Sequence, residues 1–161
     1  MTERSCPICD EVAGRRAAPG GPIYDDGLWL VSHHLGGYTD PGELIVKLRR
    51  HAESVADLTA AEAEALGPLL RAAVGAVDRA VRPERVYVAS FSERVRHVHF
   101  YVLPRTASLP AGHVLSDVYK RVRTVLRGWR LAPNPTAASR ADMAGRIRQD
   151  PSWATLRRPT S

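Results

Sequence analysis

The chain of 161 residues is 44% apolar and 25% charged, proportions typical of a single globular domain. Its formal net charge is +6, which favours anionic ligands, but the basic residues are scattered and we do not expect nucleic acid as the partner. No apolar run is long enough to span a membrane, and the first residues lack the apolar segment of a secretory signal, so we expect a cytoplasmic protein.

Short strands are predicted in the first third of the chain. Residues 1–21 have the composition of a loop, and two strands are predicted at 23–24 and 28–31, on either side of a glycine-bearing turn. A third strand is predicted over 44–48, after a loop rich in glycine and proline. The connections are too short for helical crossovers, so these strands should pair antiparallel.

A long helix is predicted to begin at the capping box formed by Thr59 and Glu62 and to end before Pro83. Apolar residues recur along one stripe of this helix at positions 66, 70, 73, 77 and 80. Pro68 lies inside the pattern and predicts a kink there, because proline removes a backbone hydrogen bond and crowds the preceding turn.

Two more strands are predicted at 86–91 and 97–103, followed by a second amphipathic helix over 114–127. Strands and helices in this order indicate the α+β class. We expect one domain over 1–130 and a C-terminal extension over 131–161.

The extension is polar and contains several prolines. Ser139 is the predicted cap of a short helix that ends near Arg148. The tail beyond it is expected to be partly flexible, or to dock through Trp153 and Leu156.

The strand predicted over 97–103 carries an unusual row of polar side chains. Because side chains alternate along a strand, the apolar residues at 98, 100 and 102 should face the core, with His97, His99 and Tyr101 on the opposite face. A strand face that only contacts solvent does not require three side chains that can donate or accept a proton. His97, His99 and Tyr101 are therefore candidate functional residues.

The two cysteines of the chain, Cys6 and Cys9, have the spacing that supplies two thiolates to one metal ion. A second interpretation is a redox-active pair, but such a pair lies between a strand and a helix of a βαβ unit. The third interpretation is that the two thiols are unreactive. No two histidines of the chain have the separation of the histidine pair in a zinc finger, in which about three to five residues lie between them. His33 and His34 precede a glycine-rich loop and are expected at the surface.

Five short segments, in this order along the chain, resemble those of the histidine-triad (HIT) family. They are Cys6-Pro-Ile-Cys-Asp-Glu-Val-Ala-Gly14, Ile23-Tyr-Asp-Asp26, Gly42-Glu-Leu-Ile-Val46, Arg50-His51 with Asp57-Leu-Thr59, and Val95-Arg-His-Val-His-Phe-Tyr-Val-Leu-Pro-Arg105. The resemblance spans roughly residues 5–127 and is greatest to bacterial members described as dinucleoside-polyphosphate hydrolases. It implies a HIT-like fold with a five-stranded antiparallel sheet, a long helix and a second C-terminal helix, and it implies a homodimer.

The resemblance also implies a structural Zn²⁺ site. In the zinc-bearing members of the family, the ligands correspond to Cys6, Cys9, His51 and His97 of this chain. Two thiolates and two neutral imidazoles are a donor set that Zn²⁺ binds in closed, structural sites.

The resemblance further implies a nucleotidyl hydrolase or transferase that cleaves a phosphoanhydride or phosphoramidate of a nucleotide-like substrate. His99 corresponds to the nucleophile that forms a covalent intermediate with phosphorus. Tyr101 takes the place of the third histidine and can donate a hydrogen bond to a phosphate oxygen. Glu93 is a candidate general acid or base.

The loop before this strand supplies the expected substrate-binding residues, Ser92, Arg94 and Arg96, of which the two arginines would attract an anion. The alternative hypothesis is a catalytically silent HIT-fold module that binds a nucleotide or a partner protein. A third hypothesis, binding to RNA or DNA, depends on the net charge alone.

Overall fold

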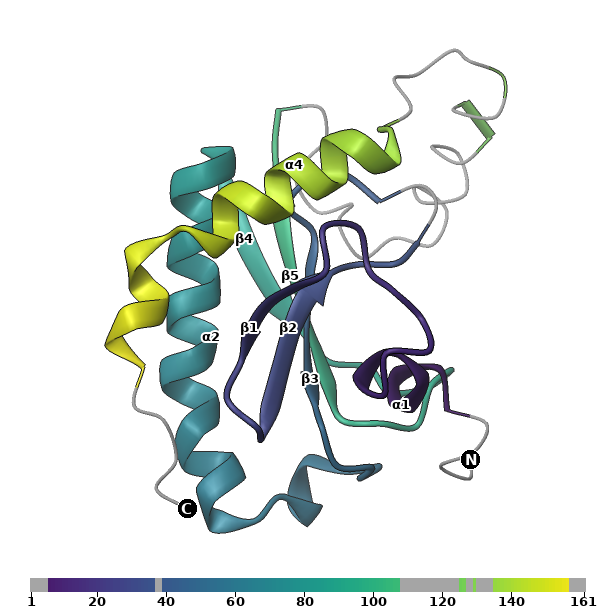
Figure 1. Cartoon of the computed structure of the whole chain (residues 1–161), viewed down its shortest axis with the longest axis vertical. Helices are drawn as coiled ribbons and strands as arrows, with labels where there is room; N and C mark the ends of the chain where they lie inside the picture. Colours follow the sequence, from purple (N-terminus) through teal and green to yellow (C-terminus); the bar gives the residue numbers. More distant parts are fainter. Residues whose placement is uncertain (1–5, 37–38, 108–124, 127–128, 130–134, 157–161) are drawn as a thin grey trace.

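The computed structural model describes residues 6–36, 39–107, 125–126, 129 and 135–156. Within them the strands form one five-stranded sheet in the order β1-β2-β3-β5-β4, and every neighbouring pair is antiparallel (Figure 1). The strands are Pro22–Asp25 (β1), Trp29–His33 (β2), Leu44–Leu48 (β3), Arg85–Ala89 (β4) and His99–Arg105 (β5). The predicted α+β class and antiparallel pairing are therefore confirmed.

The long helix α2, Ala60–Val81, begins at the predicted capping box. The Thr59 hydroxyl accepts a hydrogen bond from the Glu62 backbone N–H at 3.3 Å, and the Glu62 carboxylate accepts one from the Thr59 N–H at 2.8 Å. The helix continues unbroken through Pro68 and ends at Val81; the next residue, Arg82, has a left-handed φ of 53°. The capping box thus sets the start of the helix, as the sequence indicated.

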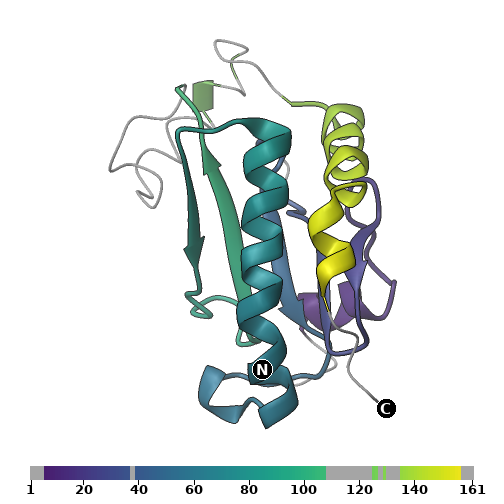
Figure 2. The same cartoon turned by 90° about the vertical axis from the view of Figure 1, so that its left-hand side faces the viewer.

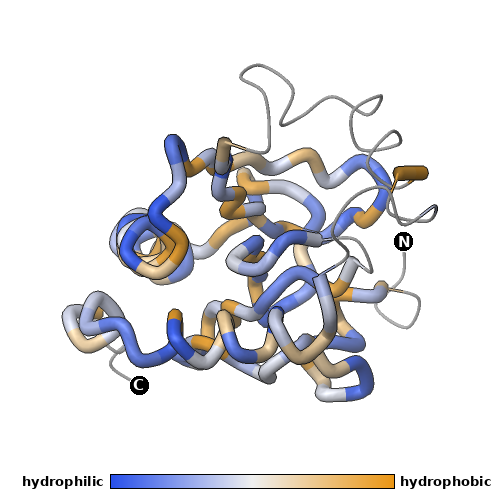
Figure 3. The backbone as a smooth tube through the Cα atoms, turned by 90° about the horizontal axis from the view of Figure 1, so that it is seen from above, coloured by the Kyte–Doolittle hydropathy of each residue, from blue (hydrophilic) through white to orange (hydrophobic). Residues whose placement is uncertain are grey.

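One face of the sheet forms the main hydrophobic core, covered by α2 and by the helix α4, Ala137–Arg148. Figure 2 shows both helices on the same side of the sheet, and Figure 3 shows hydrophilic residues on the outward side of α2. The small residues Ala72, Ala73 and Ala76 let α2 approach the strands closely, so that Leu69 and Val77 are fully buried. Each large apolar side chain buried here contributes about 1.5–3 kcal/mol.

The C-terminal helix starts earlier than predicted. Thr136, and not Ser139, caps α4, because the Thr136 hydroxyl accepts from the Ser139 backbone N–H at 3.0 Å. Of the two alternatives for the tail, the described residues show docking: in the 3-10 helix η3, Pro151–Thr155, the Trp153 ring stacks on Tyr24 at 5.3 Å between ring centroids. Leu156 packs against the same core.

Some predictions fall outside the described residues. These are the helix over 114–127, apart from residues 125–126, the boundary between residues 130 and 131, and the last five residues of the tail. Among the described residues, no helix is long and apolar enough to cross a membrane.

Candidate functional site

The two cysteines lie on the short helix α1, Pro7–Val12. Cys6 is the residue that precedes the helix and Cys9 follows one turn later, so both thiols lie on one side of α1 and both are buried. Pro7 occupies the first position of the helix, where its missing N–H has no intrahelical partner to lose. This turn presents two sulfur atoms to the end of the sheet.

Two histidines meet the cysteines there because β3 and β5 are antiparallel neighbours. His51 follows the end of β3 and His97 precedes the start of β5, and backbone hydrogen bonds between Leu48 and Val98 (3.1 Å) and between Val98 and Ala52 (2.8 Å) extend the pairing. The two imidazole rings lie 5.2 Å apart, nearly perpendicular to each other.

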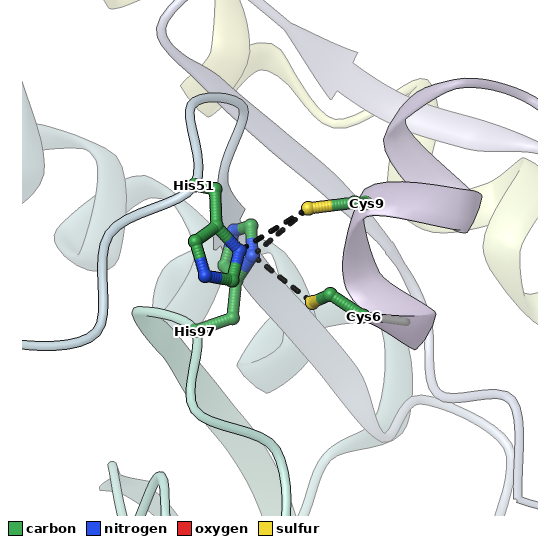
Figure 4. A group of neighbouring side chains, drawn as sticks. All are labelled: Cys6, Cys9, His51 and His97. Carbon is green, nitrogen blue, oxygen red and sulfur yellow. Dashed lines mark hydrogen bonds between the residues drawn. The ribbon is translucent and has the colours of Figure 1, made fainter. Parts of the chain in front are cut away.

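The four predicted metal ligands converge on one point (Figure 4). The Cys6 Sγ lies 3.4 Å from His97 Nδ1, and the Cys9 Sγ lies 3.3 Å from His51 Nδ1 and 3.6 Å from His97 Nδ1. A tetrahedral zinc ion with ordinary bond lengths would separate a sulfur ligand from a nitrogen ligand by about 3.5 Å. The donor set and its spacing therefore fit Zn²⁺.

The surroundings of His97 prepare its ring to act as a ligand. Its Nε2 donates a hydrogen bond to the Leu48 carbonyl at 2.7 Å, which leaves the lone pair on Nδ1, the atom that faces the sulfurs. Burial lowers the pKa of His97 to about 4, so the ring is neutral at pH 7. A backbone carbonyl that fixes the tautomer in this way is the usual outer partner of a metal-binding histidine.

His99, the candidate nucleophile, is oriented by the carbonyl of His97, to which its Nδ1 donates at 2.6 Å. The lone pair of the ring is then on Nε2. Burial lowers the pKa of His99 and outweighs the hydrogen bond to the His97 carbonyl, which raises it, so the neutral form of the imidazole that a nucleophile requires is favoured.

Tyr101 joins His99 to two aromatic residues from other parts of the chain. Its ring centroid lies 5.2 Å from that of His99, 5.5 Å from that of His34 and 6.3 Å from that of Phe91. Burial raises the pKa of the Tyr101 phenol, so this group is a neutral hydrogen-bond donor at pH 7.

The loop before β5 brings only some of its predicted residues to the site. The Ser92 hydroxyl donates to the same His97 carbonyl, at 3.3 Å, and the charge of Arg94 acts on Tyr101. Arg96 instead points toward Glu53, with 3.8 Å between its guanidinium and the Glu53 carboxylate. Glu93 is exposed to solvent on this loop.

The sequence predictions missed a buried ion pair next to His99. Lys47 is the cross-strand neighbour of His99, has no exposed surface and pairs with Glu11 of α1. Its ammonium also donates to the Ser32 hydroxyl at 2.8 Å. A lysine within the otherwise apolar strand β3 was the available signal, since a charge buried there must find a partner.

Replacing Lys47 with methionine should destabilise the protein by about 3–5 kcal/mol, because it leaves the Glu11 carboxylate buried without a counter-charge. Chemical denaturation would measure the loss. The double variant Lys47→Met, Glu11→Leu should recover most of it, since no buried charge remains. A double variant no more stable than the single one would contradict this account.

His33 was expected at the surface, and that prediction is wrong. As the last residue of β2 it faces the helices and is fully buried. Its Nε2 accepts from the Gly42 N–H at 3.2 Å and its Nδ1 donates to the His34 carbonyl at 2.9 Å. Burial lowers the pKa of His33, so it is a neutral structural residue. His34 is half-buried and lies beside Tyr101.

No protein-family model and no curated protein matches the sequence, but solved structures do. A zinc-bound histidine triad family protein from Mycobacterium smegmatis has a TM-score of 0.64 and 19% identity, with 96% of this chain and 97% of that chain covered. A HIT-like protein involved in cell-cycle regulation from Bartonella henselae, with an unknown ligand, has a TM-score of 0.64 and 14% identity, with 92% and 98% covered.

A third structure, a hypothetical histidine triad nucleotide-binding protein from Sulfolobus tokodaii, has a TM-score of 0.66 and 14% identity, with 94% of this chain and 93% of that chain covered. These structures share nearly the whole length of the chain at low sequence identity. The resemblance inferred from five short segments is therefore borne out in three dimensions: the chain has the fold of the histidine-triad family.

Proposed function

We propose that the protein is a nucleotidyl hydrolase or transferase that cleaves a phosphoanhydride or phosphoramidate of a nucleotide-like substrate through a covalent His99 intermediate. The observation that carries this proposal is the His99 ring itself. It is neutral, fixed through Nδ1 by the His97 carbonyl, and has its lone pair on Nε2. An imidazole held in one tautomer and one orientation is the arrangement that nucleophilic catalysis needs.

In the first step, His99 Nε2 attacks phosphorus, a P–N bond forms, and the bond to the leaving group breaks with its electron pair. The leaving group takes a proton from solvent or from Glu93. In the second step, water or another acceptor attacks phosphorus, the P–N bond breaks, and the proton of the acceptor passes to solvent or Glu93. The hydroxyl of Tyr101 donates to a phosphoryl oxygen, and Arg94 draws the anion toward the loop.

Zn²⁺, when bound, supplies a structural cross-link between α1 and the ends of β3 and β5. Cys6, Cys9, His51 and His97 would hold it. This assignment is supported by the convergence of the four ligand atoms within 4.8 Å of one another. The homodimer and the cytoplasmic location remain expectations from the sequence, and size-exclusion chromatography with light scattering would test the former.

The test is nucleotide release followed by chromatography. Dinucleoside polyphosphates, nucleoside phosphoramidates and nucleotide sugars are incubated with the protein, and release from one of these classes is expected. A second candidate function, a silent nucleotide-binding module, is favoured by the neutral phenol of Tyr101 where the family has a third histidine. Binding of these compounds without any release would support that module and overturn the enzymatic proposal.

A further inference from the structure

The C-terminal helix α4 is anchored firmly to the rest of the chain. Ala144 and Ile147 are fully buried in the main core, and Arg148 Nε donates to the Pro22 carbonyl at 2.7 Å. Arg140, near the start of the helix, contacts a different part of the chain, the segment that follows β2. The helix is therefore a fixed support from which Arg140 reaches that segment.

The guanidinium of Arg140 holds a turn that Gly36 and Thr39 close. Its Nη1 donates to the Gly36 carbonyl at 2.8 Å and lies 3.5 Å from the Thr39 hydroxyl, which donates to the same carbonyl at 2.8 Å. Among the described residues, the Arg140 Nε has no hydrogen-bond partner although it is buried. An arginine that extended into solvent would avoid this cost, so the contact with the turn is a specific one.

The same turn closes over the ring of His34. The Gly36 backbone N–H donates to His34 Nδ1 at 3.2 Å. A β-carbon at position 36 would lie 2.7 Å from the His34 ring and 2.9 Å from the Thr39 methyl group, so only glycine lets the turn come this close. The turn therefore leaves the His34 ring little freedom to move.

His34 connects this turn to the sheet face that carries the nucleophile. Because side chains alternate along a strand and His33 faces the helices, His34 lies on the side of His99 and Tyr101. Its ring centroid is 5.5 Å from that of Tyr101, which in turn is 5.2 Å from that of His99. The contacts therefore run without a break from α4, on one face of the sheet, to the nucleophile on the other.

We propose that Arg140 is a positioning residue for Tyr101, so that the C-terminal helix α4 takes part in the reaction. This inference rests on the proposed function, in which the Tyr101 hydroxyl donates to a phosphoryl oxygen. The hydroxyl can do so only while the Tyr101 ring is held, because a displacement of about 1 Å can lower a rate about a hundredfold. His34 packs against the ring, and Arg140 keeps His34 in place through the turn.

The kinetic test is a double-mutant cycle of Arg140→Ala with Tyr101→Phe. Arg140→Ala alone should lower kcat about tenfold, because the hydroxyl is displaced from the phosphoryl oxygen. In the Tyr101→Phe background it should have no further effect, since no hydroxyl remains to be positioned. Arg140→Lys, which keeps a donor for the Gly36 carbonyl, should recover most of the loss. The matched control is Arg146→Ala, which removes an arginine of the same helix that donates to the Ala80 carbonyl at 3.1 Å, and it should leave kcat unchanged.

A measurement on Tyr101 itself requires no turnover. In protein with isotope-labelled tyrosine rings, the NMR signal of Tyr101 is the one that is absent from Tyr101→Phe. This signal should shift in Arg140→Ala and in His34→Ala, because both changes alter the packing of the His34 ring on Tyr101, and it should stay in place in Arg146→Ala.

The two measurements separate this inference from the proposed function. A Tyr101 signal that does not move in Arg140→Ala would overturn the inference, and so would an equal fall in kcat in both backgrounds of the cycle. If the signal shifts but the wild type turns over no substrate, the proposed function fails while the placement of Tyr101 by Arg140 is supported.

Discussion

Replacing His99 with alanine should abolish nucleotide release, lowering kcat by about four orders of magnitude or more, because a covalent route cannot proceed without its nucleophile. The second imidazole of the row, His97, cannot substitute. Its Nε2 is bonded to the Leu48 carbonyl and its Nδ1 faces the two thiols. The measurement is nucleotide release by wild type and variant on the substrate class found for the wild type.

The proposed covalent intermediate on His99 can be detected independently of nucleotide release. Wild-type protein quenched during turnover of a substrate labelled at phosphorus should carry label that is lost in acid, as expected of a phosphorus–nitrogen bond to histidine. His99→Ala should carry none. His99→Gln keeps a side chain of similar length that can still donate to the His97 carbonyl, so it should keep the thermal stability of the wild type while losing both label and release. Release by either variant at the wild-type rate would rule out this mechanism.

The parts of the site that could be predicted are those that follow from chain periodicity or from a local motif. The alternation of β5 places His99 and Tyr101 on one face because successive strand side chains point in opposite directions. The capping box at Thr59 was predictable because its two hydrogen bonds join residues three apart in sequence. The two cysteines were predicted as metal ligands from their spacing, whereas the two histidine ligands came from the family resemblance, since His51 and His97 lie far from the cysteines in the chain.

The parts that could not be predicted depend on contacts between distant segments. The partner of Lys47 is 36 residues away on a helix too short to be recognised by periodicity. The contacts of Tyr101 with His34 and Phe91 follow from the order of strands in the sheet, which the sequence pattern does not specify. The prediction that His33 lies at the surface was wrong because the sequence does not show whether helices cover the sheet face on which a histidine at the end of a strand lies.

Freshly purified protein should contain one zinc ion per chain, and removing it should destabilise the fold more than any single substitution on the surface. Binding of structural zinc contributes about 10–16 kcal/mol in small zinc-finger peptides, a value as large as the whole stability of an ordinary domain. Here the cluster of Cys6, Ile8 and Cys9 forms a small core of its own, apart from the main one. Loss of the metal should therefore release α1 first.

Elemental analysis and thermal unfolding would check this prediction on wild type, on Cys6→Ser and on His34→Ala. Cys6→Ser should contain little zinc and have a clearly lower Tm, whereas His34→Ala, a half-buried histidine outside the cluster, should keep its zinc. Thiol titration distinguishes the metal from the two alternatives: both thiols should become reactive only after a chelator is added. Fresh wild-type protein without zinc would contradict the prediction, and thiols that react only after reduction would indicate a disulfide.

Removal of zinc also tests whether the metal site helps to orient the nucleophile. The carbonyl that orients His99 belongs to His97, a predicted ligand, and Ser92 is bonded to that carbonyl as well. Removing zinc should free the backbone at His97 and so increase amide hydrogen exchange along the start of β5 and the loop before it. The middle of α2, which packs on the opposite face of the sheet, should keep its protection. Equal loss of protection in both regions would instead mean that the metal stabilises the whole fold and has no particular role in orienting His99.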